Sequence, residues 1–187
     1  MRFGSVIIGL WIAFALSWLA AAAWADRTEK KAGIRNEWPY RAVLFAGAAL
    51  FLARAHGHGG WMRVWRPGPP VLWLCIALMV VGFAFCWWAR IHLGKLWSGI
   101  ITRKTDHRIV ETGPYGIVRH PIYTGLLLAI LATMVAKGTI IGIAGAAVIA
   151  TGIYMKARLE ERFLRQELGP AAYDEYAGRV PMLVPFT

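Results

Sequence analysis

Long apolar stretches alternate with short basic segments along this chain. Residues 5–25 carry no charged side chain, and residues 71–89 form another apolar stretch of similar length. Two shorter apolar stretches, 122–136 and 139–155, are separated only by a two-residue turn. An α-helix needs about 20 apolar residues to cross a bilayer. The pattern therefore predicts a polytopic membrane protein whose last two apolar helices form a hairpin.

A fifth apolar stretch, residues 42–53, is shorter than the others. With Trp38 and Tyr40 included it reaches about 17 residues, which is the lower limit for crossing a membrane. We therefore predict an all-α fold with about five transmembrane helices in a single membrane domain. Residues 1–89 hold the first three helices, and residues 90–187 hold the hairpin and a cytoplasmic C-terminal helical segment.

Small residues inside the apolar stretches predict how the helices pack. Gly138, Gly142 and Gly145 recur at three- and four-residue intervals, a spacing that lets two helix backbones approach closely. We therefore expect a close helix contact at these positions. Cys75 and Cys86 are eleven residues apart, about 16 Å along a helix. They are too distant for a disulfide, so we expect both to be packing residues.

The basic residues indicate how the helices are oriented. Sixteen Lys and Arg residues fall in segments 26–41, 90–119 and 156–187, whereas five fall near the N-terminus, in the 54–70 loop and at Lys137. Cytoplasmic segments of membrane proteins carry the excess of Lys and Arg. We therefore expect the N-terminus outside, the C-terminus in the cytoplasm, and a prokaryotic inner membrane as the location.

Composition and motifs limit the classes of molecule that this chain is expected to bind. The net charge of +11 comes from basic residues in short loops, and no recognised nucleic-acid-binding module is present. His56 and His58 resemble a metal-binding pair, but no further Cys, His, Asp or Glu lies nearby to complete a site. We therefore expect the lipid bilayer, and neither nucleic acid nor a metal ion, as a partner.

Charged residues that are candidates for a functional site flank the predicted hairpin. Arg119 and His120 precede Pro121, a residue suited to the first position of a helix. Cations are disfavoured at the N-terminus of a helix, so Arg119 and His120 at this position indicate an anionic partner nearby. Glu160 and Glu161 lie beyond the second helix, and antiparallel neighbours bring both sets to one membrane edge. The charges form either plain ion pairs, including an i,i+4 pair between Glu161 and Arg165, or one ligand-binding pocket.

The stretch 113–125 resembles a known family. It reads Gly-Pro-Tyr-Gly-Ile-Val-Arg-His-Pro-Ile-Tyr-Thr-Gly and fits the pattern G-x-Y-x-x-x-R-H-P-x-Y-x-G of the isoprenylcysteine carboxyl methyltransferases. A second block fits the same family: Lys156, Glu160, Glu161, Leu164, Tyr173, Tyr176 and a terminal Val-Pro-Phe. His107, followed by Ile109 and Val110, fits as well. The resemblance covers roughly residues 90–187.

The resemblance implies that S-adenosylmethionine binds at the cytoplasmic ends of the last two helices, enclosed by the C-terminal segment. The cofactor-binding residues it implies are His107, Val110, Gly113, Tyr115, His120, Tyr123, Glu160 and Glu161. The cofactor's carboxylate suits Arg119 or His120, and its ammonium suits a glutamate. The candidate catalytic residues are Arg119, Glu161, Arg158 and Lys156, and we favour Lys156 or Arg158 for orienting an anionic acceptor.

The predicted function is methyl transfer from S-adenosylmethionine to a lipophilic acceptor at the cytoplasmic membrane face. Carboxyl O-methylation of an isoprenylcysteine-type substrate is the nearest match. The superfamily also contains phospholipid N-methyltransferases and thiol S-methyltransferases, so an amine or a small thiol is an alternative acceptor. A membrane NADPH-dependent reductase relative is an alternative of another class. A non-catalytic membrane module with structural ion pairs is a further one.

Overall fold

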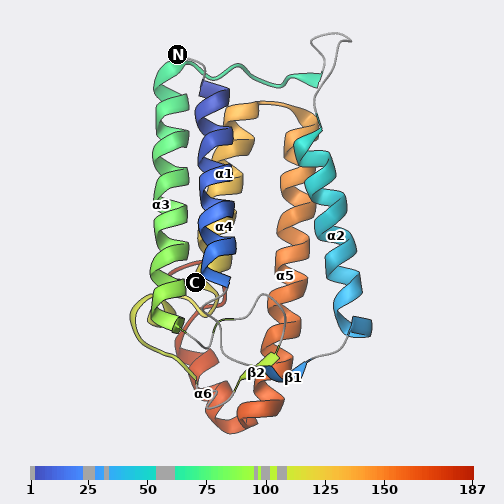
Figure 1. Ribbon diagram of the computed structural model, residues 1–187, viewed down its shortest axis with the longest axis vertical. Coiled ribbons are helices and arrows are strands. Elements are labelled where there is room, and N and C mark those ends of the chain that lie inside the picture. The colour runs from blue at the N-terminus through green and yellow to red at the C-terminus, as the bar shows by residue number, and fades with distance from the viewer. Residues whose placement is uncertain are drawn as a thin grey trace.

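The computed structural model describes residues 3–22, 28–31, 34–53, 62–94, 97, 102–104 and 109–187 (Figure 1). Its α-helices are α1 (Phe3–Ala22), α2 (Ile34–Leu52), α3 (Pro69–Leu93), α4 (Pro121–Lys137), α5 (Ile140–Leu168) and α6 (Pro170–Arg179). A 3-10 helix, η3 (Gly113–Gly116), and two short strands, β1 (Thr28–Lys31) and β2 (Thr102–Lys104), complete the described elements.

Helices α1 to α5 lie side by side and alternate in direction, as the predicted topology requires (Figure 1). Three of them, α1, α3 and α5, are long and apolar enough to span a membrane, whereas α4 is apolar but has only 17 residues. The helical bundle confirms the predicted fold class and an integral membrane protein. That α2 and α4 also cross the membrane stays a prediction.

Two elements differ from the prediction. Helix α2 begins at Ile34, so that Pro39 lies inside it rather than before it. An ion pair between Glu37 and Arg41, one turn apart, stabilises this polar extension of the apolar helix. In addition, β1 pairs antiparallel with β2 at the end of the bundle that carries α6 (Figure 1). Neither strand shows an alternating apolar pattern, which is why the sequence did not predict the ribbon.

Close packing between two pairs of helices depends on glycine. A Cβ added to Gly82 of α3 would lie 2.6 Å from the carbonyl O of Gly125 in α4. A Cβ on Gly145 of α5 would lie 2.5 Å from the main-chain N of Phe51 in α2. The close helix contact predicted at Gly145 is therefore confirmed, and its partner is α2. Both cysteines, Cys75 and Cys86, are free and buried, which confirms the packing role.

Helix α5 carries the chain beyond the apolar part of the bundle. Its 29 residues are about 43 Å long, more than the hydrocarbon core of a bilayer. The polar part from Lys156 onwards therefore projects past the other helices, as Figure 1 shows. Gly169 ends α5 and Pro170 begins α6, as the Gly-Pro pair predicts. This projection and α6 place the C-terminal residues next to the start of α4.

Candidate active site

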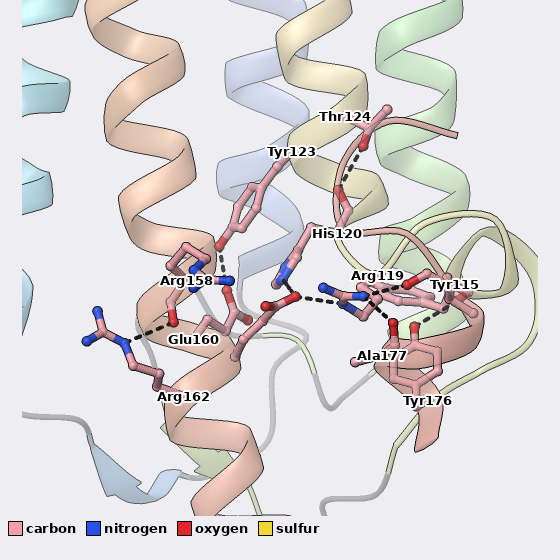
Figure 2. A network of polar contacts seen from close by, with 12 residues as sticks. Tyr115, Arg119, His120, Tyr123, Thr124, Arg158, Glu160, Arg162, Tyr176 and Ala177 are labelled. Atoms are coloured by element: carbon pink, nitrogen blue, oxygen red, sulfur yellow. Dashed lines mark hydrogen bonds and ion pairs between the residues drawn. The ribbon is translucent and has the colours of Figure 1, made fainter. Parts of the chain in front are cut away.

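Arg119, just before α4, connects α5 and α6. Its Nε donates to Oε1 of Glu161 at 2.7 Å, and both side chains are only 11% exposed. Its Nη1 donates to the carbonyl oxygens of Ala177 (2.8 Å) and Val180 (2.5 Å), at the end of α6 (Figure 2). The predicted meeting of the two charged ends of the hairpin is confirmed. The guanidinium also binds main-chain oxygens that no sequence motif marks.

His120 occupies the residue before the first turn of α4 and is buried. Its Nε2 lies 3.3 Å from Oε1 of Glu161, which makes an ion pair when the imidazole is protonated. The contact between His120 and Glu161 does not have hydrogen-bond geometry. No other group in the described part of the chain forms a hydrogen bond with this nitrogen. Its ring stacks on Tyr123 with centroids 5.3 Å apart. His120 thus has a fixed ring plane and a donor position that a ligand can use.

Tyr123 connects α4 to two further helices. Its hydroxyl donates to Oε2 of Glu160 on α5 at 2.7 Å (Figure 2). The ammonium of Lys156 lies 5.4 Å from the Tyr123 ring centroid and 5.9 Å from that of Tyr40 on α2. Both distances are within the range of cation–π attraction. Three helices therefore meet around one tyrosine, with a cation and a carboxylate on α5.

The C-terminal segment runs along the start of α4. The main-chain N–H groups of Arg119 and His120 donate to the carbonyl oxygens of Pro181 (2.8 Å) and Met182 (3.1 Å). The hydroxyl of Thr124 donates to the carbonyl oxygen of Leu183 at 2.7 Å (Figure 2). The segment therefore binds the main-chain donors of the two residues immediately before α4, which begins at Pro121.

Comparison with known proteins places this site in a family. A sequence model of the isoprenylcysteine carboxyl methyltransferase (ICMT) family matches residues 75–166, just under half of the chain. The chain belongs to an ICMT-like family. The match includes most of α3, all of α4 and most of α5, and with them all the charged residues of Figure 2.

Individual relatives carry different names. Over 114 residues the ICMT-like chain is 34% identical to protein-S-isoprenylcysteine O-methyltransferase B of Arabidopsis thaliana, covering 59% of this chain and 57% of the relative. It is 30% identical over 146 residues to the cobalt-zinc-cadmium resistance protein CzcN of Cupriavidus metallidurans (76% and 60%). It is 31% identical over 164 residues to methanethiol S-methyltransferase 1 of Bradyrhizobium diazoefficiens (77% and 53%). The matches span between about half and three fifths of these relatives' lengths.

The Gly-Pro turn of the ICMT-like motif is held in place by α3 and α6. Gly113 has a φ of +59°, and a Cβ there would lie 2.7 Å from Cε1 of His92. Tyr176 donates its hydroxyl proton to the carbonyl O of Tyr115 at 2.7 Å. Burial raises the pKa of Tyr115, Tyr173 and Tyr176 above the usual range, so these hydroxyls are protonated at neutral pH. The Tyr176 hydroxyl is therefore available as a donor at neutral pH, and its hydrogen bond joins α6 to the turn.

An exposed ion pair fixes α6 to α5. Arg165 donates from Nε and Nη2 to the two carboxylate oxygens of Asp174, at 2.7 and 2.6 Å. These hydrogen bonds from Arg165 lower the pKa of Asp174. The i,i+4 pairing of Arg165 with Glu161 was therefore wrong, because each residue binds a partner on another element. Arg179 binds Glu111 at 2.8 Å and joins α6 to the segment before η3.

The other residues predicted for the site do not join the contacts around Arg119 and Glu161. His107 lies outside the described residues. Val110 is half-buried in the segment before η3. Arg158 is exposed, and its main-chain carbonyl accepts a hydrogen bond from Nε of Arg162 at 3.3 Å (Figure 2). Of the two cations favoured for orienting an acceptor, Lys156 lies against Tyr123, whereas Arg158 faces solvent.

Sequence reasoning missed one buried cation. Arg90 follows the apolar stretch 71–89 directly and was counted only among the basic residues of segment 90–119, yet its side chain is fully buried. It donates to the carbonyl oxygens of Ala21 (2.9 Å) and Gly94 (2.5 Å), and its guanidinium lies 4.7 Å from the Trp97 ring. Arg90 therefore ties the end of α1 to α3. In the part of the chain described, no three Cys, His, Asp or Glu side chains gather as a metal site would require.

Proposed function

We propose that this chain is an S-adenosylmethionine-dependent methyltransferase that acts on a lipophilic acceptor at the cytoplasmic end of its helical bundle. The observation that carries the proposal is the convergence of Arg119, His120, Tyr123, Glu160 and Glu161 where α4 begins and α5 leaves the bundle. This convergence lies within the residues that match the ICMT family. The site has both signs of charge, as a zwitterionic amino acid group requires.

The residues present fit that cofactor with a division of roles. Arg119 already donates to Glu161 and to two main-chain carbonyls, so it serves as a positioning residue for Glu161 and the C-terminal segment. His120 has a buried Nε2 without a hydrogen-bond acceptor among the described residues, and it would take the cofactor's carboxylate. Glu160 accepts from Tyr123 through one oxygen, and its carboxylate would take the ammonium group.

The chemistry at this site is displacement at a sulfonium. When bound, S-adenosylmethionine supplies an activated methyl group, and the protein positions the attacking atom and excludes water. A carboxylate acceptor is ionised at neutral pH, so no residue need remove a proton. Lys156 would orient that carboxylate beside Tyr123. The apolar part of the acceptor would enter from the lipid, because the site lies at the edge of the apolar bundle.

A thiol acceptor is the second candidate, favoured by the similarity to a methanethiol S-methyltransferase. A thiol is mostly protonated at neutral pH, so this reaction needs a base. The carboxylate of Glu160, in contact with the Tyr123 hydroxyl, is the residue placed to take that proton.

Cofactor binding separates these proposals from the other classes. Isothermal titration of the detergent-purified full chain with S-adenosylhomocysteine, and in parallel with NADPH, should show binding of the former alone. Binding of NADPH alone would support a reductase. Binding of neither would leave the charges as structural ion pairs.

A further inference from the structure

A fixed basic segment lies at the end of the bundle opposite the candidate active site. Residues 62–67 cross this end of the bundle before α3 begins (Figure 1). The main-chain N–H groups of Val64 and Trp65 donate to the carbonyl O of Gly138, at 2.8 and 3.3 Å. The indole Nε1 of Trp65 also donates to the carbonyl O of Val135 at 2.8 Å. The segment is thus bonded to the turn that joins α4 and α5.

This segment forms one side of a shallow cavity of about 360 Å³ that is open to the surface. Arg63 and Arg66 contribute cationic side chains, and Pro67, Leu72 and Ala136 contribute apolar surface. A guanidinium group matches the oxygens of a phosphate and can bind two of them at once. The cavity therefore combines donors for a phosphate with an apolar wall.

No acidic residue lies close in sequence to the residues that line this cavity. All ten acidic residues fall within positions 26–37, 106–111 and 160–175. The stretches 38–105 and 112–159, which contain the whole cavity lining, have no Asp or Glu. The arginines therefore create a positive field here, whereas at the active-site end Arg119, Arg165 and Arg179 have carboxylate partners.

The position of the cavity relative to α3 indicates the source of the anion. Helix α3 is a membrane-spanning candidate that begins at Pro69, so its first turn lies where lipid headgroups meet the apolar core. Pro69 and Pro70 have no main-chain N–H to offer an anion, and Arg63 and Arg66 are the charged donors among the lining residues. Leu72, one turn further, faces the same cavity and lies at the depth of acyl chains.

We propose that Arg63 and Arg66 bind the phosphodiester of an anionic phospholipid, whose acyl chain lies against Leu72 and Ala136. A free phosphate ion would satisfy the arginines but leave the apolar wall in contact with water. A phospholipid can place its phosphate against the arginines and its acyl chain against the apolar wall. The site is separate from the proposed methyl-transfer centre and does not depend on it.

Lipid binding to the purified full chain tests this site. Native mass spectrometry would measure affinity for phosphatidylglycerol, for phosphatidylcholine with the same acyl chains, and for inorganic phosphate. We expect phosphatidylglycerol to bind about tenfold more tightly than phosphatidylcholine. Arg63→Gln and Arg66→Gln should each lower the phosphatidylglycerol affinity about tenfold, the effect of one charge-assisted hydrogen bond. Arg162→Gln, which removes an exposed arginine at the other end, should leave it unchanged.

Three outcomes would overturn the proposal. Equal affinity for the two lipids would show that charge is not recognised. An equal loss in Arg162→Gln would reduce the effect to general surface charge. Inorganic phosphate bound as tightly as the lipid would make this a free-anion site. Should the Gln variants not fold, Arg63→Lys and Arg66→Lys keep the charge but lose bidentate geometry, and unchanged affinity in both would also contradict the proposal.

Discussion

Arg119 and Glu161 are 42 positions apart in the chain, yet Nε of the arginine lies 2.7 Å from Oε1 of the glutamate. The pair joins the start of α4 to the polar extension of α5, and the same guanidinium holds the end of α6 through two carbonyl oxygens. Three elements of the candidate site thus depend on one ion pair. Its loss should affect both stability and the placement of the C-terminal segment.

Arg119→Gln should lower the free energy of unfolding by about 3 kcal/mol, because it removes the closest cationic partner of a buried carboxylate and leaves only His120 beside it. Unfolding of the detergent-purified protein, followed by circular dichroism, would measure this. Arg165→Gln is the matched control, since its pair with Asp174 is half exposed and screened by solvent, so its loss should change the stability much less. Equal losses in the two variants would contradict a buried, site-organising pair.

Glu160→Gln should weaken binding of S-adenosylhomocysteine at least about tenfold, because it removes the charge that would hold the ligand's ammonium group. Isothermal titration calorimetry would measure the affinity. Glu175→Gln removes an exposed carboxylate from α6 and should leave the affinity unchanged. Unaltered binding in Glu160→Gln would assign the ammonium to another residue.

Tyr40→Leu should raise the KM for a lipophilic carboxylate several-fold while the affinity for S-adenosylhomocysteine stays constant. The reason is that Tyr40 holds the Lys156 ammonium from the α2 side, opposite Tyr123. Tyr40→Phe keeps the aromatic ring and should behave like the parent protein. N-acetyl-S-farnesylcysteine is a suitable acceptor for this kinetic comparison. If KM is unchanged in Tyr40→Leu, α2 has no part in acceptor binding.

Gly82→Ala should lower the free energy of unfolding by about 2 kcal/mol or more, because its Cβ would overlap the main chain of α4 and force the helices apart. Thermal unfolding in detergent would detect the change. Gly4→Ala offers the control, since a Cβ there meets no atom within 4 Å. That control should be neutral or slightly stabilising, as expected for alanine replacing glycine in a helix. A comparable loss in both variants would refute the close α3–α4 contact.

Sequence reasoning predicted the parts of this molecule that have a side-chain signature. Apolar length predicted the helical bundle, and the Gly169–Pro170 pair predicted the end of α5. Charges at the ends of a hairpin predicted that Arg119 and Glu161 would meet, because antiparallel neighbours leave few alternatives.

Other features had no such signature. The carbonyl oxygens of Pro181, Met182 and Leu183 bind the start of α4, but main-chain acceptors are the same in every residue. Small residues indicate a close approach but do not specify the partner helix, so the contact of Gly145 with α2 was not predicted. The interaction of Lys156 with Tyr40 depends on how α2 packs, which the sequence motifs do not specify.

Methyl transfer by the purified protein tests the central proposal most directly. The full chain in lipid nanodiscs would be incubated with S-adenosylmethionine carrying a radiolabelled methyl group and with N-acetyl-S-farnesylcysteine. The proposed function predicts label in a lipophilic product that releases methanol on mild base treatment, as a methyl ester does, and loss of that label in Glu160→Gln. Absence of transfer to any lipophilic carboxylate, thiol or amine, or equal transfer to a lipid-free acceptor, would contradict it.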